Sequence, residues 1–166
     1  MMNDRAQTQA MFFDRDMIAL RSYWVKQVSG DFTGGELRSD YPRPSEYAAE
    51  TGVIDVDITG DLHEKLLRLV GSGSFLLYVT LMAALKLGLY KYTNSETIIV
   101  GSPARRHADA DAPDNVLPIV DHLTAPLSFR QLLLNGRQTL LDAYERQRYP
   151  FERLVQDVGL DHVVNK

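Results

Sequence analysis

The chain has 166 residues, of which 45% are hydrophobic and 24% charged, a composition typical of one folded domain or one lobe of a larger domain. Eighteen basic and 22 acidic residues give a formal net charge of -4, which argues against broad electrostatic binding to nucleic acid or anionic lipid. Cysteine is absent, so disulfides, thiolate metal sites and a cysteine nucleophile are excluded, and a cytoplasmic location is expected.

The most apolar stretch of the chain is too short for a membrane span. Residues 75–85 form an uninterrupted apolar run that ends at Lys86, whereas a span needs about 20 such residues. The first seven residues carry acids and amides and lack the apolar centre of a signal peptide. We therefore expect a buried helix at this stretch, no membrane partner and no export.

The N-terminal third predicts a helix, a connector and a strand. Residues 8–28 combine good helix formers with no glycine or proline, which favours a helix. Residues 29–51 hold three glycines and two prolines and are expected to form a connector. In residues 52–59, apolar side chains alternate with Asp55 and Asp57 at a period of two, which predicts a strand with one wet face.

Two helices are predicted to follow this strand. Asp61 with Glu64 three residues later matches a capping box, and leucines at helical spacing continue to a stop at Gly71. Ser74 is expected to cap the next helix, which runs to Tyr92. Because apolar residues surround this second helix almost completely, we predict that it forms the centre of the core.

Two strands and an exposed loop are predicted next. Residues 96–100 are rich in strand formers and are expected to make a buried strand that Gly101 ends. Residues 105–114 are polar and should form an exposed loop. Residues 116–124 predict another strand, in which Pro118 indicates a sheet edge or a bulge.

Two helices complete the predicted order of elements. Ser128 with Gln131 is a second capping-box pattern, and Pro150 suits the first turn of a last helix that Gly159 ends. The alternation of helices and strands predicts an α/β (α+β) fold, a mixed sheet backed by helices. The helix after Ser128 is expected to bury one face, made by Phe129, Leu133, Gly136, Leu140 and Tyr144.

Motifs from the chemistry of known sites do not predict a complete active site. The four histidines are scattered without an HxxxH or HExxH pair, so no metal site is predicted, and the glycine-rich residues 71–74 lack the spacing of a cofactor-binding phosphate loop. Ser102 is no nucleophile elbow, because Ala104 replaces the glycine of GxSxG. Asp121 and His122 are weak catalytic candidates, since neighbours on a strand point to opposite faces.

Several strings, in order along the chain, resemble motifs of one family. They match the YW…DxPRP, DIVVGSP and HQDxPFE patterns of nonribosomal peptide synthetase condensation domains, with similar gaps, over roughly residues 22–158. The matching strings are Tyr23-Trp24 followed by Pro42-Arg43-Pro44, then Gly101-Ser102-Pro103, and last Tyr149-Pro150-Phe151-Glu152.

This resemblance implies a fold and a division of the chain. The fold would be the second, C-terminal lobe of a chloramphenicol-acetyltransferase-like pair. Residues 1–28 would form an N-terminal helix, 29–51 a connector, 52–159 a partial C-terminal lobe and 160–166 a tail.

The family's chemistry is only partly represented in this sequence. Condensation is the attack of an aminoacyl amine on an acyl thioester, with both groups held on the phosphopantetheine arms of carrier domains. The family's catalytic HHxxxDG signature lies in the first lobe, and this sequence contains no His-His pair. Its IGxFVNT motif should fall at residues 116–122, where Leu117, Asp121 and His122 replace Gly, Asn and Thr.

Three roles follow as hypotheses. The chain is expected to be a noncatalytic scaffold lobe packed beside adenylation and carrier domains, with no cofactor of its own and phosphopantetheine only on those carrier domains. Alternatively it is one lobe of an active enzyme completed by a missing first lobe that bears HHxxxDG. A third option is a self-associating module, because a partial domain exposes an apolar face and forms a homo-oligomer.

Overall fold

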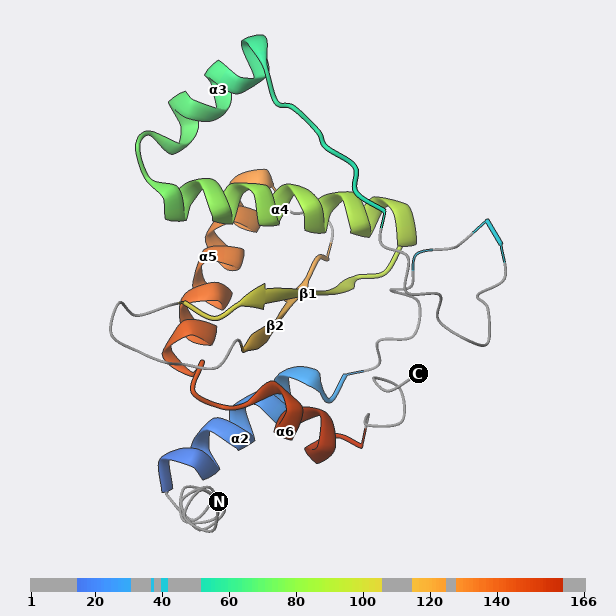
Figure 1. The fold of residues 1–166 in the computed structure, drawn as a ribbon, viewed down its shortest axis with the longest axis vertical. Helices are drawn as coiled ribbons and strands as arrows, with labels where there is room; N and C mark the ends of the chain where they lie inside the picture. The colour runs from blue at the N-terminus through green and yellow to red at the C-terminus, as the bar shows by residue number, and fades with distance from the viewer. Residues whose placement is uncertain are drawn as a thin grey trace.

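The computed structural model describes residues 15–30, 37, 40–41, 52–105, 115–124 and 128–159. The start of the predicted N-terminal helix, most of the connector with Pro42, Arg43 and Pro44, and the tail 160–166 lie outside the described residues. The described elements, drawn in Figure 1, are α2 (Arg15–Val28), α3 (Gly60–Val70), α4 (Ser74–Thr93), β1 (Thr97–Pro103), β2 (Val116–His122), α5 (Phe129–Glu145) and α6 (Phe151–Asp157).

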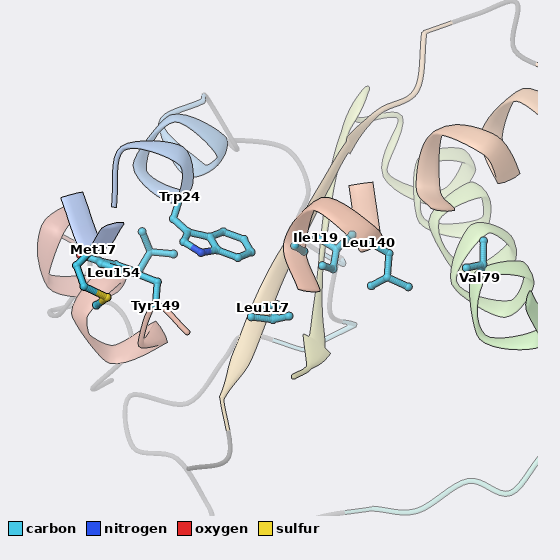
Figure 2. Packing of buried hydrophobic residues seen from close by; sticks show 9 residues of the cluster. Met17, Trp24, Val79, Leu117, Ile119, Leu140, Tyr149 and Leu154 are labelled. Atoms are coloured by element: carbon cyan, nitrogen blue, oxygen red, sulfur yellow. The ribbon is translucent and has the colours of Figure 1, made fainter. Parts of the chain in front are cut away.

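The two strands form an antiparallel sheet, in which helices cover β2 on both faces. The register runs without interruption from Thr97 opposite His122 to Pro103 opposite Val116. Figure 2 shows α2 and α6 on one side of the strands and α4 and α5 on the other. A strand covered on both faces loses the alternation of a half-buried strand, which explains why the five central residues of β2 are all buried.

Side chains from both helix layers meet the strands in one main core. Leu117 and Ile119 of β2 lie between Trp24 on one side and Leu140 on the other (Figure 2). The rest of this buried cluster is Met17, Val79, Ala143, Tyr149 and Leu154. A smaller cluster beside it contains Ala83, Ile98, Leu123 and Leu132. The sheet therefore acts as the middle layer that joins segments far apart in the sequence.

The strand predicted at residues 52–59 is not formed. The segment has no strand, turn or bend, and it leads into α3 as a stretched trace (Figure 1). A strand is held by ladder hydrogen bonds to a neighbour, and the described residues provide no neighbour at this position. The mixed sheet expected from the sequence is correspondingly an antiparallel pair in the described part of the chain.

Both helices after this segment are confirmed, but their predicted caps are wrong. α3 begins two residues earlier than the capping box implies, with Thr59 instead of Asp61 at the N-cap and no side-chain capping bond, which leaves Asp61 inside the first turn. Ser74 is likewise the first residue of α4, and Gly73 occupies the N-cap. Gly71 ends α3 as predicted, with a positive φ of 59° that favours glycine.

α4 is less covered than its sequence suggests. Val79, Thr80, Ala83 and Lys86 are buried, whereas Leu81 and Leu85 on the same helix are exposed. The prediction that this stretch is too short for a membrane span is wrong by length and composition alone, since α4 is long and apolar enough to cross a membrane, and 28% of its apolar window is buried within the structure. Core helices of globular proteins have the same length and composition, and one face of α4 packs against β1 and α5.

The strand predictions are right in kind and wrong in extent. β1 continues through Gly101-Ser102-Pro103 instead of ending there, and its burial alternates. A side chain at Gly101 would bring Cβ to 3.1 Å from Val116 Cγ1, so glycine permits this close pairing. Pro118 stands opposite Gly101 in a regular register, which fits the edge alternative and not the bulge.

The C-terminal helices follow the prediction closely. The Ser128 side chain accepts a hydrogen bond from the Gln131 amide at 3.2 Å and so caps α5. Leu140 and Ala143 bury one face of this helix, although Phe129 at its start is exposed. α6 begins after Pro150, and Gly159 follows it with a positive φ of 70°.

Candidate functional site

A buried ion pair occupies the strand where the sequence suggested catalytic candidates. Lys86 from α4 places its Nζ 2.5 Å from Asp121 Oδ2 on β2, and the two side chains are 1% and 7% exposed. The other carboxylate oxygen of Asp121 accepts a hydrogen bond from Thr139 Oγ1 on α5 at 2.6 Å. We call Lys86, Asp121 and Thr139 the buried triad. It joins three elements and uses both oxygens of Asp121.

The position of Lys86 in the triad follows from helix geometry. Val79, Ala83 and Lys86 are spaced by four and three residues, so they share the face of α4 that turns toward the sheet. The ammonium also donates to the Ile119 carbonyl at 3.0 Å. Burial lowers the pKa of Lys86, while the Asp121 carboxylate opposes that shift. The cost of removing the Lys86 ammonium from water is thus offset by its hydrogen bonds to Asp121 and to the Ile119 carbonyl.

His122 does not work together with Asp121. Its side chain is exposed, and its Nδ1 lies 3.0 Å from Thr97 Oγ1 on the neighbouring strand. The two residues thus differ in burial, as the alternation of a strand predicts. Because Asp121 points into the triad and His122 points to solvent, the carboxylate cannot orient this imidazole as a general base.

The Tyr23-Trp24 string holds α2 against the end of α5. Trp24 is buried and its Nε1 donates to the Arg146 carbonyl at 2.9 Å. The Arg146 guanidinium lies 4.4 Å from the centre of the Tyr23 ring, which is a cation–π geometry. Burial raises the pKa of Tyr23, and Arg146 acts in the opposite direction. Both aromatic residues therefore have structural partners.

Sequence reasoning missed Asn115, which organises the segment between α5 and α6. Its Nδ2 donates to the carbonyls of Gln147 and Tyr149, both at 2.8 Å, and its Oδ1 accepts from the Phe151 amide at 2.9 Å. Its backbone carbonyl accepts from the Ala104 amide at 2.9 Å. A single asparagine after a polar stretch gives no sequence signal of this role. Asn115 links the ends of both strands to the Tyr149-Pro150-Phe151 string.

Tyr149 closes the same junction from within. Its side chain is buried, and its hydroxyl donates to Asp157 on α6. Asp157 also forms ion pairs with Arg21 on α2 at 3.0 Å and with Arg153 at 3.5 Å. Burial and the hydrogen bond to Asp157 raise the pKa of Tyr149 from 10.0 to about 12. Of the neighbouring string residues, Phe151 is half-buried, while Pro150 and Glu152 are exposed.

Ser102 in the Gly101-Ser102-Pro103 string is fully buried. It is 0% exposed and accepts a hydrogen bond from the Tyr78 hydroxyl of α4 at 2.9 Å. Its own hydroxyl donates to the Pro103 carbonyl at 3.2 Å. Burial also raises the pKa of Tyr144, which adjoins Ser102. Among the described residues this enclosed hydroxyl has no hydrogen bond to a histidine, lysine or carboxylate, and its complete burial leaves no access for a substrate.

No group of three or more His, Cys, Asp or Glu side chains able to hold a metal ion occurs among the described residues. The buried polar side chains described above connect helices and strands to one another. The resembling strings that the structure describes bind α2, the strands and α6 together, and the buried triad fixes α4 and α5 on the other side.

The comparisons with known proteins agree on one family. The family described as Condensation domain matches residues 6–166. Gramicidin S synthase 2 of Aneurinibacillus migulanus is 32% identical over 160 residues, covering 92% of this chain and 4% of that protein. Surfactin synthase subunit 1 of Bacillus subtilis (strain 168) is 32% identical over 152 residues, covering 88% of this chain and 4% of that protein.

Solved structures give the same fold. The starter condensation domain of rhizomide synthetase aligns with a TM-score of 0.62 at 21% identity, over 96% of this chain and 34% of that one. The first condensation domain of the calcium-dependent antibiotic synthetase, in complex with a substrate analogue, aligns with a TM-score of 0.61 at 16% identity, over 93% of this chain and 37% of that one. The present chain thus spans about a third of these solved chains and about 4% of the curated relatives.

Proposed function

Because the chain belongs to the condensation-domain family of nonribosomal peptide synthetases, we propose that it is a noncatalytic partial lobe that acts as a structural scaffold between neighbouring domains in peptide biosynthesis. The observation that carries the proposal is the buried triad. Asp121 is the acid of the Asp121-His122 pair that the sequence offered as weak catalytic candidates, and both of its oxygens are bound, one to Lys86 and the other to Thr139. The Asp121 carboxylate therefore serves to hold α4, β2 and α5 together.

The sequence supports the same role. The 166 residues contain no His-His pair and hence no HHxxxDG signature. Ser102 is enclosed by Tyr78 and Pro103, so it offers no alternative nucleophile. The proposal includes adenylation and carrier domains as partners, phosphopantetheine on those carrier domains only, and a cytoplasmic location.

The direct test is amide formation by the purified chain. It is mixed with one carrier protein loaded with an aminoacyl group and another loaded with a peptidyl group, and the product is followed by mass spectrometry. We expect the same amount of amide as in a sample without the chain, whereas a complete condensation domain with its HHxxxDG motif gives product in the parallel sample. Amide above the protein-free sample would contradict the proposal.

A second role is favoured by the length of the match. Since the chain covers 34% of one solved condensation-domain chain and 37% of another, a separate polypeptide that bears HHxxxDG could supply the remainder and complete an active enzyme. Co-expression with a first lobe taken from a relative should then yield a stable complex and turnover. Failure of the two polypeptides to co-purify would remove this second role.

A further inference from the structure

Residues 53–58 have the pattern of a strand but no sheet. Val53, Ile54 and Val56 are 79%, 90% and 79% exposed. The segment contains no turn or bend, and Figure 1 shows it as a stretched trace that leads into α3. No backbone hydrogen bond joins these residues to another part of the described chain. Within the described part of the chain, their amide and carbonyl groups therefore have no backbone partner.

The apolar surface around this segment is extensive. Of the 18 large hydrophobic side chains exposed among the described residues, 11 lie between Val53 and Tyr92. α3, which follows directly, exposes Leu62, Leu67 and Leu69. Exposed apolar surface beyond single scattered residues is typical of sites of protein association. An extended segment whose backbone groups have no partner among the described residues favours one mode in particular, the addition of a partner strand.

A second copy of the chain fits this edge poorly. In an antiparallel pair centred on Val56, Asp55 of each copy faces Asp57 of the other. Centring the pair on Asp55 or Asp57 places that residue opposite the same residue of the other copy. Shifting the register by one position places each aspartate opposite an isoleucine or a valine. Parallel in-register pairing places each aspartate beside its own copy. Like charges directly opposite each other destabilise a strand pair, so the charge pattern selects against self-pairing.

We propose that residues 53–58 are a docking edge for a β-strand of a different polypeptide, in which apolar residues alternate with lysine or arginine. The apolar residues of that strand would pack against Ile54, Val56 and Ile58, and its basic residues would face Asp55 and Asp57. Opposite-charge and apolar cross-strand pairs each stabilise such pairing. The inference rests on the proposed function in one respect, since it gives the scaffold a defined surface for its partner.

The test uses three synthetic peptides with blocked ends. The first is Ile-Lys-Val-Lys-Ile flanked by threonines, the second replaces its lysines by glutamates, and the third groups the lysines at one end. Binding is titrated by NMR together with hydrogen exchange of the amides of residues 53–58. The alternating lysine peptide should bind at least tenfold more tightly than the other two and should slow exchange at these amides.

Two variants identify the binding edge. Val53→Pro/Val56→Pro removes one amide donor from each side of the segment and should abolish binding of the lysine peptide. Asp55→Lys/Asp57→Lys should transfer the preference to the glutamate peptide. Because these exposed residues have no partner in the described structure, both variants are expected to fold, which near-ultraviolet circular dichroism of the buried Trp24 would verify.

Several outcomes would overturn the inference. These are equal affinity for the three peptides, unchanged binding by the proline variant, and concentration-dependent self-association that protects residues 53–58 without peptide. The result is separable from the proposed function. Amide formation by the chain would contradict the noncatalytic role whether or not the peptide binds, and failure of peptide binding would leave that role intact with a different contact surface.

Discussion

Lys86 and Asp121 form an ion pair inside the protein, with the Lys86 ammonium 2.5 Å from the Asp121 carboxylate. Removing two charges from water is costly, and their attraction offsets that cost only when the geometry is good and further hydrogen bonds are made. Thr139 and the Ile119 carbonyl provide those bonds. The buried carboxylate of Asp121 is therefore accommodated by partners on α4 and α5.

Breaking this pair from one side should be worse than removing it altogether. Lys86→Met leaves Asp121 buried without its cation and should lower the free energy of unfolding by about 3–5 kcal/mol. Lys86→Met/Asp121→Leu removes both charges and should recover most of that loss. Urea unfolding of the wild type, both single variants and the double variant measures the coupling. Additive effects of the two single changes would show that the pair has no mutual stabilisation.

Tyr149 should make the protein sensitive to high pH. An unfolded tyrosine loses its proton near pH 10, whereas folded Tyr149 retains it to about pH 12. Between these values the folded state binds more protons, so the free energy of unfolding falls as the pH rises, by at most about 1.4 kcal/mol per pH unit. The contribution is fully present below pH 10.

Tyr149→Phe is the matched variant for this effect. It removes the hydroxyl that donates to Asp157 and should cost about 1 kcal/mol at neutral pH. Unfolding free energies measured at several pH values between 9 and 12 should fall less steeply for the variant than for the wild type. Parallel curves for the two proteins would rule out Tyr149 as the source of the alkaline loss.

Among the elements, the segment between α5 and α6 depends most on distant contacts. Trp24 of α2 binds the Arg146 carbonyl, the Arg105 amide donates to the Gln147 side chain at 2.7 Å, and Asn115 binds three backbone groups. α6 is only seven residues long, too short to be stable alone. Its position is therefore set by the contacts of the segment that precedes it.

Asn115→Ala tests this dependence. The change removes three hydrogen bonds and leaves two carbonyls and the Phe151 amide without their partner. At roughly 1 kcal/mol for each bond, the free energy of unfolding should fall by about 3 kcal/mol, and amides of α6 should exchange faster than those of α4. Asn135→Ala, on the exposed side of α5, is the control. Equal exchange rates in α6 of the Asn115 variant and the wild type would contradict the assigned role.

Helices were predictable where local signals agree, and positions set by distant contacts were not. The predicted capping bond from Gln131 to Ser128 is formed within one turn, whereas the equally local caps predicted at Asp61 and Ser74 are not formed. The strand at residues 52–59 was wrongly predicted, because period-two alternation marks a segment suited to a sheet but cannot provide its neighbour. Asn115 and the Lys86 partner of Asp121 were missed for a related reason. Their contacts join residues more than 30 positions apart.

Residues of the strings that resemble family motifs hold the fold together. Trp24, Ser102 and Tyr149 are buried and hydrogen-bonded to other elements. The exposed apolar surface is concentrated between residues 53 and 92, away from the junction of α2 and α6. A lobe with internal order on one side and an open apolar face on the other is suited to packing against a neighbour. This is the physical basis of the scaffold proposal.

Amide formation compared between the unmodified chain and His122→Ala tests the central claim most directly. Both are incubated with loaded aminoacyl and peptidyl carrier proteins, and the product is quantified by mass spectrometry. The noncatalytic role predicts that both samples match the protein-free sample, because Asp121 is held in the buried triad and cannot orient His122. Product above that level for the unmodified chain, reduced in the His122→Ala sample, would contradict it.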